Sequence, residues 1–401
     1  MSRKYIFFKH LIFYNVCLIL LYSCATQKVE LSQTPIPFDS AVRTMVHHLF
    51  NEIRNDQNIF EKLGQINVVL DPIVDASSGE IVKVSRQIEQ IFFEENQKNF
   101  SDFAFNRMTS QNLPDAQYVI NGLIYFDEYK NAKTPKKYYH LSASAINLKN
   151  RKKIAEFSVW ILEQDLDYTP SPFYQDSPIY LKDKRIESLK IIVESPIGDE
   201  ADEVYYDSLD IHALVIEAET FYEQKDYQKA LTLFQKAQKR PDGQLMRTYA
   251  GLYETYVKLG QKDKATKAFG QLLILSLKEN NKLNIKFLFD VNSPEFIDDA
   301  GLIKEYMAWL QMIAQYFQEN NQCFQIAGHC SRTGTAAYND KLSLSRALTV
   351  QKLMQAYLPD IMQRTTVVGK GFRENLVGIG TDDARDAIDR RVEILVMNCS
   401  Q

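Results

Sequence analysis

The segment from 283 onward most constrains the fold of this 401-residue chain, because strand and helix patterns alternate along it in a definite order. Short runs rich in β-branched residues predict strands, and longer runs with apolar residues three or four apart predict helices. The expected order is strand, helix, strand, helix, strand, strand, over 284–290, 303–317, 323–328, 342–357, 365–371 and 391–397. These elements predict an α+β domain over 283–399.

Four short motifs lie along this segment. They are Gly328-His329-Cys330-Ser331-Arg332-Thr333-Gly334, Tyr338-Asn339, Leu342-Ser343-Leu344-Ser345-Arg346-Ala347 and Asp389-Arg390-Arg391-Val392-Glu393. Together they resemble the peptidoglycan-binding domain of the OmpA-like family, whose motifs read G-H-T-D-x-x-G, Y-N, L-S-x-x-R-A and N-R-R-V-E. The resemblance implies a β-α-β-α-β-β domain that binds the stem peptide of peptidoglycan and catalyses no reaction.

The same resemblance assigns the binding residues. Arg346 falls on the family's helical arginine, which implies that it binds the carboxylate of the stem-peptide diamino acid, a task suited to a bidentate guanidinium. Asn339 and Arg391 fall on family positions around this pocket. Ser331 replaces the family aspartate that pairs with the ligand ammonium, so it offers a hydrogen bond without a charge. We expect Arg346 in the first turns of its helix, where free N–H groups also favour an anion.

A purely structural domain is the alternative. Arg390 and Arg391 could brace the adjoining loop through salt bridges with Asp382, Asp383 or Asp386. The domain would then keep the family fold without binding the wall.

The N-terminus predicts export. Basic residues precede an apolar run over 11–22 that is too short to span a membrane, as in a secretory signal peptide over 1–23. The end of this run, Leu21-Tyr22-Ser23-Cys24, resembles a bacterial lipobox, which implies that Cys24 becomes an acylated N-terminus. An ordinary signal peptide with an incidental cysteine is the alternative. Ala25, in place of an aspartate, favours the outer membrane, with the protein facing the periplasm.

An oxidising compartment would leave Cys323, Cys330 and Cys399 able to form one disulfide. Cys323 opens the second strand of the C-terminal domain, and Cys399 closes the last. If these strands are antiparallel neighbours, both cysteines lie at the same end of the sheet. We therefore predict a Cys323–Cys399 disulfide and a free Cys330.

The sequence before the C-terminal domain predicts four further segments. A tether (24–36) leads to an α/β sandwich-like domain (37–165) with helices from Phe38 and over 83–94 and strands over 66–72, 118–126, 138–147 and 153–161. This domain resembles those of penicillin-binding-protein activator and curli-export lipoproteins, through its V-V-L-D-P strand, V-D-x-x-x-G-E turn and A-x-Y-V-I-x-G strand. The resemblance implies protein binding, and a generic scaffold is the alternative.

A connector rich in proline and tyrosine (166–209) is expected to run extended and to pack on a neighbour. Helical hairpin repeats follow over 210–280. Tyr222 and Tyr256 lie 34 positions apart, which is the tetratricopeptide period. Two units are fewer than the three that usually stack alone, so they should lean on a neighbour. These helices could form a peptide-binding groove or serve as a helical spacer, and the sequence does not decide between the two.

The remaining features exclude other classes. A net charge of −4 disfavours nucleic-acid binding. No histidine or cysteine spacing predicts a metal site, and no motif predicts a cofactor. His329 and Cys330 are adjacent, so their side chains should point apart and form no catalytic dyad. The sequence thus predicts a non-enzymatic, lipid-anchored protein that binds peptidoglycan and an unidentified protein partner. The alternative is a regulator of a peptidoglycan synthase or an envelope-assembly scaffold.

Overall fold

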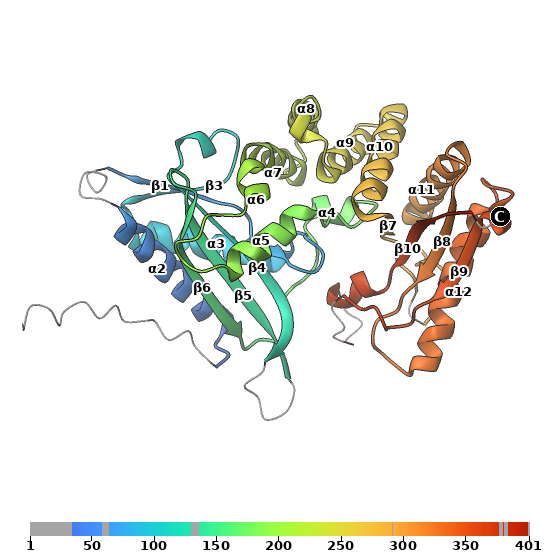
Figure 1. The fold of residues 1–401 in the computed structure, drawn as a ribbon, viewed down its shortest axis with the longest axis horizontal. Coiled ribbons are helices and arrows are strands. Elements are labelled where there is room, and N and C mark those ends of the chain that lie inside the picture. Colours follow the sequence, from blue (N-terminus) through green and yellow to red (C-terminus); the bar gives the residue numbers. More distant parts are fainter. Residues whose placement is uncertain are drawn as a thin grey trace, which may run out of the picture.

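A computed structural model describes residues 34–57, 64–129, 136–290, 292–376, 380 and 384–399. The chain is a mixed α+β protein, as predicted, with one sheet near each end of the molecule and a row of helices between them (Figure 1). The predicted signal peptide over 1–23 and the predicted acylation site, Cys24, lie outside the described residues. Within the described ranges, no helix is both long and apolar enough to cross a membrane.

The N-terminal sheet has the strand order β3-β1-β4-β5-β6. The strands at one end, β1 and β3, run parallel to β4, whereas β4, β5 and β6 form an antiparallel meander. A two-residue strand, β2, also pairs with β4. The strand bounds are β1 Ile66–Leu70, β2 Val74–Asp75, β3 Phe103–Arg107, β4 Tyr118–Tyr129, β5 Lys136–Asn147 and β6 Lys152–Ile161. The short strand β3 was not expected from the sequence.

Two helices, α2 (Phe38–Asp56) and α3 (Lys83–Asn99), pack together on one face of this sheet. Successive side chains of a strand point to opposite faces, so Val68 joins the core beneath these helices and Val69 joins the core on the other face. Phe50 of α2 stacks on Phe103 at 4.6 Å between ring centroids. This aromatic contact holds β3 in the sheet.

The connector is not extended, contrary to the sequence expectation. It forms α4 (Pro172–Asp176), α5 (Lys184–Glu194) and α6 (Glu203–Asp207), and α5 packs on β4 and β5. Pro172 occupies the first turn of α4, where a missing N–H costs nothing, and Asp183 and Asp202 cap the next two helices. The prolines therefore separate short helices instead of preventing them.

A buried ion pair attaches the connector to the N-terminal sheet. Arg185 of α5 pairs with Asp71, and the Tyr205 hydroxyl donates to the same carboxylate at 2.8 Å. All three side chains are buried. The connector tyrosines thus pack against a neighbouring domain, as the sequence suggests.

Four helices follow in two consecutive pairs. They are α7 (Leu209–Glu223), α8 (Tyr227–Gln238), α9 (Met246–Lys258) and α10 (Lys262–Asn280). Gly251 lets α9 approach α8, because a Cβ atom there would lie 2.2 Å from the Phe234 ring. The helices also contact the C-terminal domain, where the Trp309 indole donates to the Tyr253 hydroxyl at 2.6 Å. Their core is continuous with that of the C-terminal domain.

The C-terminal domain has the predicted order of elements. Its sheet has the order β7-β10-β8-β9, antiparallel except for the parallel β8–β9 pair, and α11 and α12 complete the fold. The bounds are β7 Lys282–Ile285, α11 Ala300–Glu319, β8 Cys323–Gly328, α12 Ala336–Met354, α13 Ile361–Arg364, β9 Thr365–Gly369 and β10 Val392–Met397.

Two boundaries in this domain differ from the expectation by about five residues, and the others by three or fewer. The first strand ends at Ile285 and not near 290, and α12 begins at Ala336 and not near 342. Thr335 caps α12 by accepting a hydrogen bond from the Tyr338 N–H at 3.3 Å. The helix therefore starts before its apolar pattern does.

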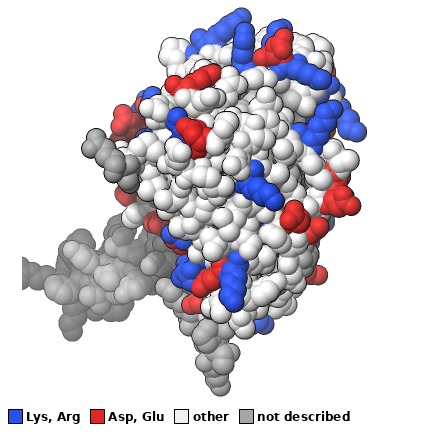
Figure 2. Space-filling view, turned by 90° about the vertical axis from the view of Figure 1, so that its right-hand side faces the viewer, with Lys and Arg blue, Asp and Glu red and all other residues white. Residues whose placement is uncertain are grey.

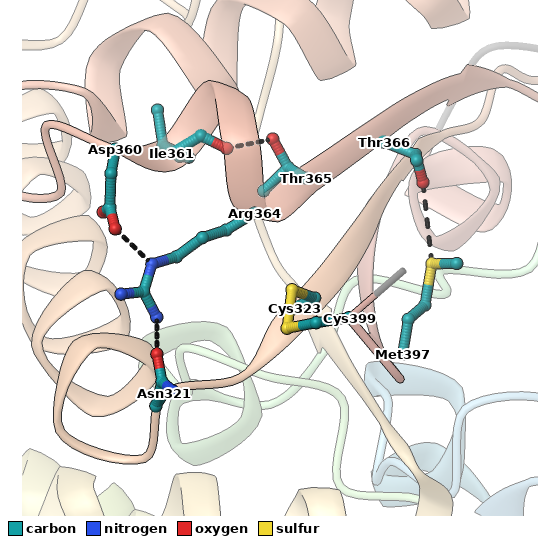
Figure 3. The surroundings of a disulfide bond; sticks show 9 residues. All are labelled: Asn321, Cys323, Asp360, Ile361, Arg364, Thr365, Thr366, Met397 and Cys399. Carbon is teal, nitrogen blue, oxygen red and sulfur yellow. Dashed lines mark hydrogen bonds and ion pairs between the residues drawn. A yellow bond between two sulfur atoms is a disulfide. The ribbon is translucent and has the colours of Figure 1, made fainter. Parts of the chain in front are cut away.

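The predicted disulfide is present. Cys323 at the start of β8 bonds to Cys399 just after β10, with Cα atoms 5.0 Å apart, because Met397 lies opposite Cys323 in the antiparallel pair. Figure 3 shows this bond beside Arg364, which contacts Asp360 and Asn321. Cys330 is buried and takes no part in a disulfide.

The connector also joins the C-terminal sheet. The Tyr180 N–H donates to the Asn284 carbonyl at 3.0 Å, and the Lys286 N–H donates to the Pro178 carbonyl at 3.0 Å, so the connector extends the sheet beside β7. The Lys286 ammonium pairs with Glu80 of the N-terminal domain. These contacts position the two sheets relative to each other.

Figure 2 views the end of the molecule that carries the C-terminal domain. Lys and Arg side chains are interspersed with Asp and Glu side chains on this face, and neither sign forms a continuous field. Such a surface does not attract a polyanion over a long range.

Candidate functional site

The motif residues gather where β8 ends and α12 packs against the sheet. Gly328 is the last residue of β8, and a Cβ atom there would lie 1.9 Å from the Ser343 carbonyl oxygen of α12. At Gly369 of β9, a Cβ atom would lie 2.5 Å from the Asp340 carbonyl oxygen. Glycine at both positions therefore allows α12 to lie directly on the strands. This close approach brings the loop after β8 over the helix.

Arg346 lies at the centre of the candidate site and is 2% exposed. Its Nε donates to the Ser293 carbonyl at 3.0 Å, and one terminal nitrogen donates to the Asp290 carbonyl at 3.2 Å. The other terminal nitrogen is 3.7 Å from the Cys330 sulfur, and the guanidinium lies 4.9 Å from the centre of the Phe289 ring.

The expected position of Arg346 in the first turns of its helix is wrong. Because α12 starts at Ala336, Arg346 lies ten residues, or about 15 Å, from the first residue of the helix and well beyond its first turn. The free N–H groups and the positive end of the helix dipole are confined to that turn. An anion at Arg346 would thus be bound by the guanidinium, without help from the helix terminus.

Asn339 and Ser331 shape the loop above Arg346. The Asn339 side chain donates to the carbonyls of Thr333 at 2.6 Å and Thr335 at 3.1 Å, which holds the loop against the start of α12. Gly334, between these two residues, has a φ of 82° that a side chain would disfavour. The Ser331 hydroxyl is 3.5 Å from that of Thr333, and Ser331 is 4% exposed.

Arg391 contacts protein groups on β10 and in the preceding loop, but within the described residues it pairs with none of the aspartates named in the alternative expectation. Its guanidinium pairs with Glu393 at 2.8 Å and donates to the carbonyls of Ile388 at 3.4 Å and Glu374 at 3.2 Å. All three of its nitrogens thus contact protein groups, and its ion-pair partner is Glu393 instead of a loop aspartate. Two of the aspartates suggested from the sequence, Asp382 and Asp383, lie outside the described residues.

His329 is buried beside this pair. Burial, reinforced by the positive charge of Arg391, lowers the pKa of His329 to about 4. Burial acts to raise the pKa of Glu393, but Arg391, Lys282 and His329 outweigh it and lower that pKa. The Cys330 sulfur contacts Arg346 and the Asn339 carbonyl, whereas His329 lies 3.8 Å from Glu393. The adjacent histidine and cysteine thus have different neighbours, and the geometry offers no catalytic dyad.

The sequence did not indicate the carbonyls that bind Arg346. Asp290 and Ser293 follow β7, and the Tyr338 hydroxyl also donates to the Asn292 carbonyl of this segment at 3.4 Å. The signal available in the sequence was Asn292-Ser293-Pro294, which we interpreted only as the end of a strand. Across the described residues, no three His, Cys, Asp or Glu side chains are placed to hold a metal ion.

Comparison with known proteins identifies the C-terminal domain. The OmpA family model matches residues 296–388, so the chain contains an OmpA family domain. Ser331, Asn339 and Arg346 lie inside the matched range, and Arg391 lies just beyond it.

Similar solved structures include three bacterial proteins. The peptidoglycan-associated lipoprotein from Burkholderia pseudomallei is 28% identical over 28% of this chain and 89% of its own, with a TM-score of 0.24. The cell wall anchor of the T6SS from Pseudomonas aeruginosa is 28% identical over 29% of this chain and 80% of its own, with a TM-score of 0.24. An outer membrane protein from Borrelia burgdorferi B31 is 24% identical over 29% of this chain and 88% of its own, with a TM-score of 0.23. No curated protein matches the chain.

Proposed function

We propose that this protein is a lipid-anchored outer-membrane protein that faces the periplasm and binds peptidoglycan non-covalently through residues 283–399. The observation that carries the proposal is the OmpA family match over 296–388, which includes the buried Arg346 and the loop above it. The role is one of binding and not of catalysis. It would link the outer membrane to the cell wall.

Arg346 is the proposed receptor for the stem-peptide carboxylate. In the structure its guanidinium donates to two neutral backbone carbonyls, those of Ser293 and Asp290. A carboxylate would add a full opposite charge and a bidentate geometry that these backbone carbonyls lack, so it can replace them. Ser331 would contact the ligand ammonium through its hydroxyl. Binding therefore requires Asp290 and Ser293 to withdraw from the guanidinium.

Sedimentation with purified peptidoglycan sacculi tests this assignment. Arg346→Ala should weaken binding at least about 30-fold, because losing one partner of a buried charge pair costs about 2–5 kcal/mol. Arg364→Ala is the matched control, since Arg364 lies beside the disulfide at the start of β8. That end of β8, Cys323, is five residues or about 17 Å along the strand from Gly328 at the candidate site. Equal binding by Arg346→Ala and wild type, with both folded by circular dichroism, would contradict the proposal.

A variant expected to bind sacculi more tightly complements the Arg346→Ala variant. Ser331→Asp should tighten sacculus binding, because it supplies a negative charge for the ligand ammonium. If this variant changes nothing and Arg346→Ala also binds normally, the domain is better described as a scaffold that keeps the family fold.

The lipid anchor is proposed from the lipobox alone. Cys24→Ala should move the protein from the membrane pellet to the soluble fraction, or leave it unprocessed, because acyl chains contribute about 0.8 kcal/mol per buried methylene. A Cys24→Ala protein that stays in the membrane and is processed normally would refute the anchor.

We also propose the domain organisation inferred from the sequence: 37–165, 166–209, 210–280 and 283–399, with activator-like and tetratricopeptide-like parts before the wall-binding domain. A second candidate function, regulation of a wall synthase or of envelope assembly, is favoured by the contacts that join these parts. Trp309 binds Tyr253, and Lys286 binds Glu80, so a partner on the first domains would be held at a fixed place relative to the wall.

Affinity capture after cross-linking in cells distinguishes the two functions. The second predicts that the Arg346→Ala chain still captures a wall synthase while it no longer sediments with sacculi. Loss of every specific partner together with wall binding would leave anchoring as the only function.

A further inference from the structure

A cavity of about 400 Å³ lies where the N-terminal domain, the connector and the C-terminal domain meet. Glu80, just after β2, lines it from the N-terminal domain, Tyr174 from the connector, and Trp309 of α11 from the C-terminal domain. Its volume falls within the range of small-molecule sites, about 300–1,000 Å³. None of the residues that contact Arg346 lines the cavity, although Ile388, whose carbonyl accepts from Arg391, does.

The charge of the lining is mainly negative. It contains four carboxylates, those of Asp75, Glu80, Asp176 and Glu305, and one ammonium, that of Lys286. Three of the carboxylates have partners: Asp75 accepts from Ser78, Glu80 pairs with Lys286, and Asp176 pairs with Lys258. Glu305 alone among the four has no hydrogen-bond or ion-pair partner in the part of the chain that the structure describes.

The electrostatic environment agrees with this excess of negative charge. Glu305 is exposed at the cavity mouth but partly shielded from water, which raises its pKa, and the nearby Asp176 raises it further. Glu254 on α9 is fully buried and without a hydrogen-bond partner among the described residues, and its pKa is raised well above normal by burial and then by Asp176. Burial by itself favours only the neutral acids, and it is the contribution of Asp176 to both pKa values that reflects a locally negative potential.

Aromatic side chains form the rest of the wall. They include Tyr174, Tyr180, Tyr306 and Trp309, and the hydroxyl of Tyr174 is buried without a hydrogen-bond partner in the described structure. The Lys286 ammonium lies 4.7 Å from the centre of the Tyr180 ring, so one cation already packs against this aromatic surface. Aromatic faces attract ammonium groups, most strongly where water is excluded.

We propose that this cavity binds an alkylammonium group, with Glu305 as its ion-pair partner and the aromatic wall around its apolar chain. The combination of a free carboxylate, aromatic faces and an orphaned hydroxyl suits an ammonium that carries several methylenes. A lysine side chain of a peptide and a free amine share this chemistry. Because all three parts of the chain line the cavity, the ligand would also hold them together.

Calorimetric titration of the soluble chain that starts at Ala25 tests the proposal. The probes are n-butylammonium, Nα-acetyl-lysine methylamide, and n-butanol as the uncharged match. We expect a Kd on the order of 1 mM or tighter for at least one ammonium probe, which corresponds to about −4 kcal/mol, and binding of n-butanol at least about tenfold weaker. Binding of the lysine amide alone identifies a peptide side chain as the source, and binding of butylammonium alone identifies a free amine.

Variants on α11 locate the site. Glu305→Gln should weaken ammonium binding about fivefold or more, and Glu305→Lys should abolish it by placing a competing cation at the cavity. Glu319→Gln, on the same helix but outside the lining, should bind as wild type. Glu305 is exposed, so these changes should leave the fold intact, as melting curves would verify.

The two tryptophans provide an independent readout by NMR. The indole N–H signal of Trp309 should shift when the probe binds, and that of Trp160 should not. Equal binding of butylammonium and butanol, unchanged binding by Glu305→Lys, or no binding of either ammonium probe would each overturn the proposal.

Discussion

Removing the Cys323–Cys399 disulfide should destabilise the C-terminal sheet by a predictable amount. The bond closes a loop with a sequence separation of 76 residues. The chain-entropy relation gives about 3 kcal/mol for a 15-residue loop and about 4.7 kcal/mol for a 100-residue loop, so this loop corresponds to about 4.5 kcal/mol. The bond ties the outer end of β8 to that of β10, and the loop that it closes contains α12 and β9.

Hydrogen exchange measures this loss at the strands themselves. Ile326 of β8 and Ile394 of β10 lie opposite each other, and their amides report the opening of the sheet. A loss of about 4.5 kcal/mol would accelerate exchange about 2,000-fold where the whole domain must open, since each factor of ten corresponds to about 1.4 kcal/mol. The paired variant Cys323→Ser/Cys399→Ser should show this acceleration with or without reductant.

The wild-type protein under reducing conditions is the matched comparison. Reductant should accelerate exchange in the wild type to the level of the double variant and should not affect the double variant. Cys330 is 1% exposed and should resist thiol labelling in every folded sample. If reduction or double substitution accelerates exchange less than about tenfold, the loop-closure reasoning is wrong for this domain.

Three further predictions follow from buried charges. Burial lowers the pKa of His329 from the usual 6.5 to about 4, so the folded state favours the neutral imidazole. The contribution of His329 to the free energy of unfolding should be complete above about pH 6.5 and fall toward pH 4. His329→Gln should therefore flatten this part of the pH profile measured by urea denaturation. Arg185→Met should cost about 3–5 kcal/mol in urea denaturation, because it leaves Asp71 buried without its cation, whereas Arg185→Met/Asp71→Leu should recover most of the loss. Lys286→Met should leave Glu80 uncompensated and speed proteolysis of the connector, unlike Lys352→Met on the outer side of α12.

Local patterns in the sequence were sufficient to predict the order of strands and helices in the C-terminal domain. Each strand and helix there has a clear period, and the motifs lie between them, so the order of elements and the OmpA family resemblance could be recognised from the sequence. The Cys323–Cys399 pairing followed from the same order, because it required only that β8 and β10 be antiparallel neighbours. Information about neighbours along the chain determines features of this kind.

Features that depend on residues far apart in the sequence were missed or misplaced. The strand β3 is short and is held by Phe50 of α2, and the connector helices depend on the sheet against which α5 packs. Neither has a strong period of its own. Tertiary contacts override such weak local preferences, and proline near a helix start does not oppose the helix.

For the candidate site too, some features were determined by the sequence and others only by the tertiary structure. The sequence by itself determined that Arg346, Asn339, Ser331 and Arg391 belong to one domain, because their motif spacing is a property of the chain. Only the tertiary structure decided that Arg391 pairs with Glu393 and that carbonyls of Asp290 and Ser293 contact the Arg346 guanidinium. Backbone carbonyls carry no side-chain signature, and their positions depend on how β7, β8 and α12 pack. Sequence spacing can therefore identify the residues of this site, but their partners are fixed only when the strands and helix pack together.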